Sequence, residues 1–415
     1  MEPVLLPNCV HNFYYSSIIQ NLCHPSEQNN PSHFYLIDLS LSQWAEFLFL
    51  LLRLIHALCM ARREGKEAFI NPEDANRSVS IQPSMNVRSG GFSNSSLPKF
   101  LSLSSSAIAE KFNLIDRYEK AIAARPTSFL QHTSLSNRNR YPDIRPWAHN
   151  TIQLDALEFP ENYINASPIS LGTNGNNYIA TQGPGPGDTI MHFWQMVWQE
   201  KAEVIVMLTR CVEAGKVKCN VYMPLQINQN IQIHAGPVSK WGEIECVSQK
   251  TEHWGEIRRF RILREKGSKY EERYVYHLLF MCWPDHQVPQ KENDQMALLN
   301  LTSLSRQIMG RPDDFAEAQK PPRIVHCSAG VGRTGTFIAL DYLLRELEQD
   351  KWDNLLDHED PIFDTVQRLR EQRMGLVNNI QQYTFIYKIL RESWKRHNSH
   401  KSRYSAVVNA PGAFP

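Results

Sequence analysis

The sequence predicts an α/β domain over most of the chain, and three stretches carry that prediction. Residues 324–325 are apolar and β-branched, which is typical of a buried strand, and the largely apolar stretch 337–344 beyond a short loop is typical of a helix. The continuous apolar run Val204–Leu208 predicts a second buried strand in the middle of a sheet. Three apolar residues at helical spacing predict an amphipathic helix that covers the core. They are Ile108, Phe112 and Ile115.

The other elements are predicted from the same patterns. An aromatic-rich stretch at 193–198 indicates a helix whose rings belong to the core. Stretches 244–247, 257–263 and 274–278 are predicted strands, and the alternation of apolar and charged residues in the second indicates one wet face. Helices are predicted over 295–309, over 366–374 with Gly375 as the C-terminal stop, and up to about Arg396 at the end of the domain.

The loop between residues 325 and 337 contains one cysteine and three glycines. Glycines let successive N–H groups point at one centre, and the helix N-terminus that follows favours an anion. Cys327 lies at the start of this field, so we expect a thiolate at neutral pH, which is the nucleophilic form. Arg333 can grip two phosphate oxygens with its planar guanidinium. The loop therefore predicts a phosphate site that contains a nucleophile, and it is not a nucleotide P-loop because no Gly-Lys-Ser/Thr closes it.

The full string His326-Cys327-Ser328-Ala329-Gly330-Val331-Gly332-Arg333-Thr334-Gly335 resembles the signature of the protein tyrosine phosphatases, of the tyrosine-specific, non-receptor type, with a fungal-like member as one option. The resemblance spans roughly Leu97 to Arg396. It implies a highly twisted mixed β-sheet flanked by helices, with the phosphate-binding loop between a central strand and a helix. It also implies that loop amides hold phosphate, that Thr334 donates to the thiolate and that His326 tunes the cysteine. A strand-end histidine bonded to backbone is the alternative reading of His326.

A second motif, Trp283-Pro284-Asp285, resembles the mobile loop of the same family. The resemblance makes Asp285 the general acid that protonates the tyrosine leaving oxygen, which requires a proton on its carboxyl group when the loop closes. Without its position upstream of the cysteine loop, this motif would be a weak signal.

The stretch Asn139–Ile144 would by itself indicate only a turn. It resembles the family's substrate-recognition loop, in which a tyrosine forms the wall of a deep cleft. The resemblance makes Tyr141 that wall and Asp143 the acceptor for backbone N–H groups of the substrate. Arg140 is expected to be a buried, structural arginine.

Glu213 and Lys218 match a family hairpin whose glutamate pairs with the catalytic arginine and whose lysine approaches the general acid. A solvated charged hairpin is the alternative. The family's last active-site loop carries two glutamines, of which Gln382 matches the second and Asn378 replaces the first. Asparagine is one methylene shorter, and a misplacement of about 1 Å can cost roughly 100-fold in rate. We therefore expect slower hydrolysis of the phosphocysteine, or a shift of the loop that compensates.

The whole chain has 415 residues, is 42% hydrophobic and 21% charged, and carries a net charge of +1. A sizeable core is therefore possible, and the charge balance does not indicate a nucleic-acid partner. The eight cysteines lack paired spacings, so neither a metal site nor a disulfide framework is indicated. A catalytic thiol and dispersed cysteines favour the cytosol or nucleus, and we expect a cytoplasmic protein.

Residues 1–96 are expected to be a poorly structured extension and linker, 97–398 the catalytic domain and 399–415 a tail. No secretory signal pattern opens the chain. The apolar run at 47–60 is interrupted by Arg53 and His56 and is short for a membrane span. A spanning helix, a packed or interfacial helix and a stretch without stable structure all stay open, so membrane association is not expected but is left open by this segment.

The resemblance predicts a protein tyrosine phosphatase that acts on phosphotyrosine-containing proteins without a metal or another cofactor. Two alternatives stay open: a catalytically weak phosphotyrosine-binding protein of the same fold, and a dual-specificity phosphatase. Cys327, Asp285 and Arg333 are all present, which argues against the first alternative. Tyr141 argues against the second. An exposed thiolate is also expected to be inactivated reversibly by peroxide.

Overall fold

The computed structural model describes residues 97–155, 161–172, 176–185, 188–235, 240–266, 269–285, 287–309 and 321–408. All of them belong to one compact unit, Gly90–Pro415. The apolar run at 47–60 and the rest of the expected extension lie outside the described residues, as does most of the expected tail. None of the described helices is both long and apolar enough to cross a membrane.

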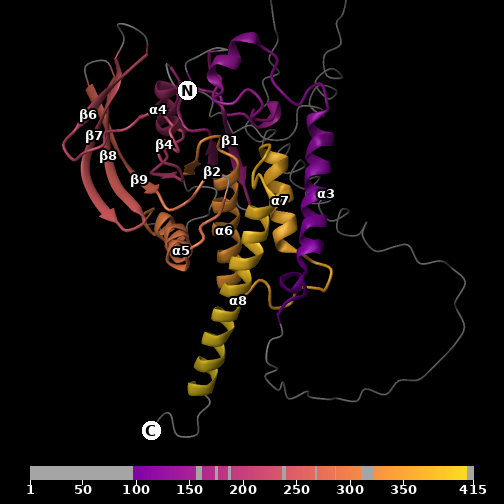
Figure 1. The fold of residues 1–415 in the computed structure, drawn as a ribbon. Coiled ribbons are helices and arrows are strands. Elements are labelled where there is room, and N and C mark those ends of the chain that lie inside the picture. Colours follow the sequence, from indigo (N-terminus) through magenta and orange to yellow (C-terminus); the bar gives the residue numbers. More distant parts are fainter. Residues whose placement is uncertain are drawn as a thin grey trace, which may run out of the picture. The chain divides into compact units, whose positions relative to one another are not determined.

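The centre of the unit is a mixed sheet in which the described residues form eight strands (Figure 1). In spatial order these are β1 (Ala166–Ser170), β2 (Asn176–Thr181), β10 (Arg323–His326), β3 (Val204–Met207), β9 (Lys269–Phe280), β8 (Gly255–Lys266), β7 (Lys240–Glu252) and β6 (Asn230–His234). Strands β2, β10, β3 and β9 run parallel to one another, and the outer strands pair antiparallel. The predicted mixed sheet, with the cysteine strand β10 in its parallel centre, is confirmed.

Both faces of the central strands are buried, which explains their unbroken apolar runs. Val204 and Val206 pack into one core cluster and Ile205 and Met207 into the other, as alternation along a strand requires. The first cluster includes side chains of five helices, and the second includes one helix. The five are α3 (Ser105–Ala123), α5 (Glu292–Gln307), α6 (Gly332–Glu348), α7 (Pro361–Gln372) and α8 (Ile380–Val408), and the one is α4 (Thr189–Gln199).

Shorter elements complete the unit. They are the 3-10 turns η1 (Lys99–Ser102), η2 (Thr133–Arg138) and η3 (Ala148–Asn150), and the hairpin of β4 (Val212–Glu213) with β5 (Lys216–Val217).

Helix α7 shows how local sequence sets an element's limits. The Asp360 side chain accepts hydrogen bonds from the N–H groups of Ile362 and Phe363, and Pro361 occupies the first turn, where it costs no hydrogen bond. Beyond the other end, Gly375 has φ +71°, as expected for the residue that ends this helical pattern.

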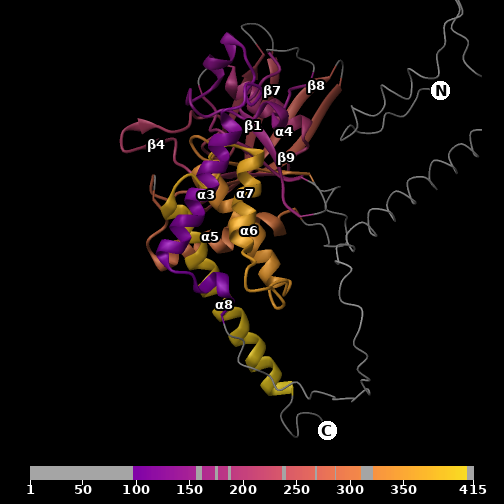
Figure 2. The ribbon, with the colours of Figure 1, turned by 90° about the vertical axis from the view of Figure 1, so that its right-hand side faces the viewer.

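The predicted limits of three strands and of the closing helix were wrong. The predicted strands extend further in β7, β8 and β9 because charged residues also face each other across the ladder, as Arg264 and Glu271 do beyond the predicted limits. The closing helix continues beyond Arg396 to Val408 and extends away from the other elements (Figure 2). His397 bonds to Asp350 at 2.7 Å and Lys401 to Asp353 at 3.1 Å. Polar contacts with the 350–353 turn, and not an apolar stripe, therefore stabilise this part of α8.

Candidate active site

Cys327 follows β10 directly and lies on a cleft of about 500 Å³. Its side chain is only 5% exposed, so the sulfur is reached only through this cleft. Twelve of the sixteen residues predicted from the sequence line it: Tyr141, Asp143, Lys218, Asp285, Cys327, Ser328, Ala329, Val331, Gly332, Arg333, Asn378 and Gln382. Four further lining residues were not predicted: Ile144, Lys216, Val217 and Asn379.

The backbone of the loop is arranged as an anion site. None of the six N–H groups of residues 328–333 donates a hydrogen bond to another described residue. Gly330 has φ +71°, and a Cβ there would lie 2.1 Å from the Thr181 carbonyl oxygen, so only glycine fits. The loop runs into α6, whose N-terminus adds the positive end of its dipole. Unpartnered amides in a buried loop are costly unless a ligand accepts their hydrogen bonds.

A fully buried arginine that the sequence did not reveal supports this loop from behind. The Arg373 guanidinium donates to the carbonyl oxygens of Gly330 at 2.9 Å and Ala329 at 3.3 Å, and to the Asn165 side chain at 2.7 Å. By occupying the loop carbonyls, Arg373 turns the opposite, N–H side of the same peptides toward the cleft. The sequence showed Arg373 only as a basic residue near the end of a helix, so nothing in the local pattern revealed this contact.

Arg333 is held for planar, two-point binding. Its guanidinium donates to both carboxylate oxygens of Glu213, at 2.9 and 2.8 Å, and to the Leu208 carbonyl at 3.1 Å. Burial alone would raise the pKa of Glu213, but the hydrogen bonds and charge of Arg333 outweigh it and lower that pKa. Burial likewise opposes the charge of Arg333, yet Glu213 and Cys327 raise its pKa. Glu213 therefore holds Arg333 in place, while residues 214–217 of the same hairpin are exposed, as the alternative of a solvated hairpin would have them.

Asp285 lies over the same site. Its carboxylate pairs with Arg333 at 3.1 Å and forms a short contact with the Lys218 ammonium. The hydrogen bond to Asp285 raises the pKa of Lys218. The approach of Lys218 to the predicted general acid is thus present in the structure.

The recognition loop is fixed beside the cysteine. The Ser328 hydroxyl donates to the Lys218 carbonyl at 2.7 Å, so the Tyr141 hydroxyl, 2.8 Å away, donates to Ser328. The Arg140 guanidinium donates to the carbonyl oxygens of Gly183 and Pro184, which confirms its structural role, but the residue is half-buried and not buried as expected.

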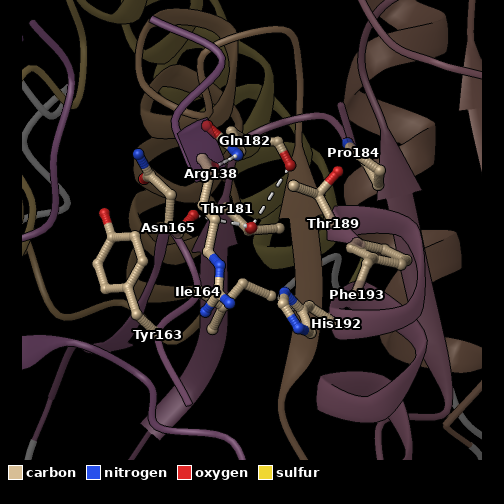
Figure 3. A pocket seen from close by; sticks show the side chains of 10 residues that line it. All are labelled: Arg138, Tyr163, Ile164, Asn165, Thr181, Gln182, Pro184, Thr189, His192 and Phe193. Atoms are coloured by element: carbon tan, nitrogen blue, oxygen red, sulfur yellow. Dashed lines mark hydrogen bonds between the residues drawn. The ribbon is translucent and has the colours of Figure 1, made fainter. Parts of the chain in front are cut away.

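The Gln182 side chain holds the start of the recognition loop. Its oxygen accepts from the Arg140 N–H at 2.8 Å. Its NH2 group donates to the Arg138 carbonyl at 2.7 Å (Figure 3). One amide side chain therefore bonds both ends of the short segment 138–140. Tyr141 directly follows this segment, and its side chain forms one wall of the cleft.

The last loop contributes a further wall of the cleft. Gln382 is 2% exposed, and its side-chain oxygen accepts the backbone N–H of Asn378 at 3.0 Å. The N–H of Gln382 donates to the Asn379 side chain at 2.9 Å, which begins α8. Asn378 itself is exposed at the cleft.

Four predicted residues do not line the cleft. Glu213 reaches it through Arg333, and Gly330 shapes the loop. His326 is fully buried behind the cysteine, with Nδ1 3.0 Å from the Cys327 carbonyl oxygen. Burial lowers its pKa to about 4. The Thr334 hydroxyl is buried and has no hydrogen-bond partner among the described residues, so its predicted bond to the cysteine sulfur is not formed here.

Sequence and structure comparisons agree with this geometry. Residues 135–392 match the protein-tyrosine phosphatase family model, and the chain belongs to this family. Tyrosine-protein phosphatase 2 of Schizosaccharomyces pombe is 37% identical over 265 residues, which are 62% of this chain and 34% of that protein. Tyrosine-protein phosphatase non-receptor type 9 of Rattus norvegicus is 32% identical over 308 residues, 72% of this chain and 49% of that protein.

A solved structure of PTPN18 in complex with HER2 phosphopeptides superposes with a TM-score of 0.59 at 29% identity. It covers 69% of this chain and 99% of that one, which confirms the fold. The chain spans between a third and a half of the length of the two curated relatives named above.

Proposed function

We propose that this chain hydrolyses phosphotyrosine in proteins through a phosphocysteine intermediate on Cys327. One observation carries the proposal: a cysteine lies in a cleft inside a loop whose six N–H groups have no partner among the described residues, beside a guanidinium fixed by Glu213. The structurally similar PTPN18 was solved in complex with HER2 phosphopeptides, which supports a phosphotyrosine substrate here.

In the first step, the Cys327 thiolate attacks phosphorus, and the bond from phosphorus to the tyrosine oxygen breaks. Asp285, which must carry the proton, gives it to the departing oxygen. Arg333 and the loop N–H groups hold the three equatorial oxygens, where charge accumulates in the transition state. In the free protein, Asp285 forms ion pairs with Arg333 and Lys218. When the substrate binds, its phosphate replaces Asp285 in part of this ion pairing.

In the second step, water attacks the phosphocysteine and Asp285 takes its proton, so inorganic phosphate and the thiolate are regenerated. Asn378 and Gln382 orient this water. The Thr334 hydroxyl has no partner among the described residues, lies one residue beyond Arg333 and is available to donate to the leaving sulfur. His326 holds the backbone of Cys327 through its carbonyl.

The cleft also supports selection of tyrosine over serine. The Tyr141 wall, held by Ser328, makes the route to the sulfur deep, so a phosphate on the long tyrosine ring reaches Cys327 and one on serine does not. Asp143 lies exposed at the same cleft, where it can accept N–H groups of the peptide backbone. A thiolate nucleophile works only where thiols stay reduced, which supports a cytoplasmic location, and it is open to reversible oxidation.

The proposal is tested by comparing the wild-type chain with Cys327→Ser on phosphotyrosine and phosphoserine peptides of one sequence. We expect wild-type turnover on the first peptide only. The serine variant should lose at least about 10³-fold in kcat, because a neutral hydroxyl replaces the thiolate, yet still bind phosphotyrosine through the loop N–H groups. Turnover that survives in Cys327→Ser would refute the proposal, and equal turnover of both peptides would indicate dual specificity.

One observation favours a second candidate, a phosphotyrosine-binding protein with weak turnover. Asn378 is shorter than the glutamine expected at the position that orients water. Stable trapping of substrate phosphate on wild-type Cys327 would favour this candidate.

A further inference from the structure

Three side chains behind the catalytic loop form a hydrogen-bonded row. The Tyr222 hydroxyl lies 2.7 Å from Nε2 of His326 and 2.9 Å from Nε2 of His277. All three side chains are fully buried. His326 ends β10, which leads to Cys327, and His277 lies in β9, which leads to the Asp285 loop. The row therefore joins the two strands that carry the proposed nucleophile and general acid.

The position of every proton in this row follows from the hydrogen bond that His326 makes at one end of it. Nδ1 of His326 lies 3.0 Å from the Cys327 carbonyl oxygen, which can only accept, so Nδ1 carries the proton. A neutral His326 then has a bare Nε2, which accepts from the Tyr222 hydroxyl. Because that hydroxyl has given away its one hydrogen, its oxygen must accept from Nε2–H of His277.

The surroundings of His277 require the same tautomer. Its Nδ1 is buried and has no hydrogen-bond partner among the described residues, as expected for a bare nitrogen. Arg258 on β8 is the residue opposite His277 in the ladder and is itself buried. Burial, then the charge of Arg258, lowers the pKa of His277 well below its ordinary value. The Phe260 ring packs at 5.4 Å, so no acidic group among these neighbours would stabilise a second proton.

We propose that His277 is a positioning residue that fixes the tautomer of His326 through Tyr222 and thereby prepares Cys327 for attack. This inference rests on the proposed role of Cys327 as nucleophile. Without the His277 donor, the Tyr222 oxygen is free to accept from Nε2–H of His326. The bare Nδ1 would then face the Cys327 carbonyl, lone pair against lone pair, and would no longer hold the backbone of the cysteine.

The size of the effect follows from cooperativity. A donor to the Tyr222 oxygen strengthens the hydrogen bond from Tyr222 to His326, by roughly 10–30% for each bond in such a chain. Loss of this support should reduce the thiolate fraction of Cys327 on the order of twofold at pH values below its alkylation midpoint. Loss of the Tyr222 hydroxyl itself should have a larger effect.

The experiment compares His277→Leu with His277→Gln in the full chain. Glutamine can place an amide N–H near the site of Nε2–H, whereas leucine fills space without a donor. Two readouts are used: ¹⁵N NMR of the histidine rings, which reports which nitrogen is protonated, and the rate of Cys327 alkylation by iodoacetamide as a function of pH. Neither readout requires turnover, and thermal melting shows whether each variant is folded.

We expect wild-type His326 protonated at Nδ1 and His277 at Nε2. In His277→Leu, an Nε2–H form of His326 should appear, and alkylation at acid pH should fall about twofold, while His277→Gln stays near wild type. In a Tyr222→Phe background, His277→Leu should have no further effect, because its action passes through the hydroxyl.

Three results would overturn the inference: wild-type His326 protonated at Nε2, identical readouts for the leucine and glutamine variants, or additive effects of His277→Leu and Tyr222→Phe. A merely structural His277 would lower the melting temperature and leave the tautomer of His326 unchanged. If wild-type turnover survives in Cys327→Ser, the proposed function fails instead, and the two failures are thereby distinguished.

Discussion

Asn378 is exposed at the cleft, and its backbone N–H is bonded to the side chain of Gln382. That bond uses one lone pair of the side-chain oxygen of Gln382, and the Gln382 side chain still lines the cleft. In the proposed mechanism Asn378 and Gln382 orient the attacking water, and the Asn378 side chain is one methylene shorter than the glutamine expected at this position.

We therefore expect Asn378→Gln to accelerate hydrolysis of the phosphocysteine. The added methylene should raise the rate of the second step by up to about 100-fold, since a misplacement of about 1 Å lowers a rate by roughly that factor. Rapid-quench measurement of the burst and of the steady-state rate on a phosphotyrosine peptide separates the two steps. Gln381→Asn, at an exposed neighbour in the sequence, is the control. A wild-type enzyme without a burst would show that hydrolysis is not slow and that Asn378 is adequate.

At the scale of single residues, the sequence predicted those site residues that occur in short, contiguous strings. The Cys327 loop and the Trp283-Pro284-Asp285 string carry their chemistry in adjacent positions, so their resemblance to family motifs identified them as candidates. Tyr222 and Arg373 were missed because each acts on residues more than forty positions away. A buried polar side chain takes its role from the partner that satisfies it, and only the fold determines that partner.

At the scale of elements, the phosphate loop depends on a helix that does not touch the cleft. Arg373 follows α7 and binds two loop carbonyls and Asn165 from the protein interior. Burial lowers the pKa of Arg373 to about 10, which still leaves it charged at neutral pH. The loop is thus shaped from both sides, by Arg373 behind it and by α6 after it.

Arg373→Met should cost on the order of 3 kcal/mol in the free energy of unfolding, because it leaves buried acceptors without donors. It should also weaken phosphate binding, since the loop N–H groups lose their fixed direction. Urea denaturation and inhibition by inorganic phosphate measure the two effects. Arg368→Met, at an exposed position of α7, removes the same side chain and should change stability by less than about 0.5 kcal/mol. Equal effects of the two substitutions would contradict the assigned role.

The element limits show why patterns only partly predicted the fold. Runs such as Val204–Leu208 identified buried strands, because burial on both faces leaves a strong signal. The end of β8 and the later turns of α8 carry charged residues, such as Arg264, which faces Glu271 in the ladder, and His397, which bonds to Asp350, and these contribute no apolar period. Their extent therefore depended on partners that the local sequence does not reveal.

At the scale of the whole molecule, every residue placed in the site lies between Tyr141 and Gln382. The core around the site includes residues from Phe100 onward. We propose that 97–398 is the catalytic domain and that the preceding residues are not needed for chemistry.

A chain that begins at residue 97 should keep kcat and KM on a phosphotyrosine peptide within about twofold of the full chain. The reason is that Phe100 and Leu101 retain the packing that anchors the start of the domain. The two chains are assayed side by side and fractionated from the same cells. A large loss of activity in a folded short chain would show that the first 96 residues take part in catalysis, and a changed fractionation alone would assign them to localisation.

Three buried histidines, His192, His277 and His326, should make stability depend on pH across the whole unit. Burial lowers the pKa of His192 and of His326 to about 4, and burial with the charge of Arg258 lowers that of His277 well below its ordinary value. The unfolded chain binds protons on these rings below about pH 6.5, while the folded chain does not, so stability falls as pH decreases from 6.5 toward 4. The carboxyl groups act in a different window: the pKa values of Glu213 and Asp341 are lowered by folding, so their stabilisation is lost only at more acid pH.

Between pH 7.5 and pH 5, we expect each of these histidines to cost on the order of 1–2 kcal/mol in the free energy of unfolding. His192 allows the cleanest test, because it lies away from the catalytic loop in the small pocket beside Phe193 (Figure 3). His192→Gln cannot take up the proton and should flatten the pH dependence of the urea midpoint, whatever it does to stability at pH 7.5. His234→Gln, at an exposed position of β6, should leave that dependence as in the wild type. If His192→Gln and the wild type lose equal stability between the two pH values, His192 is not held neutral by the fold, and the acid sensitivity of the molecule has another origin.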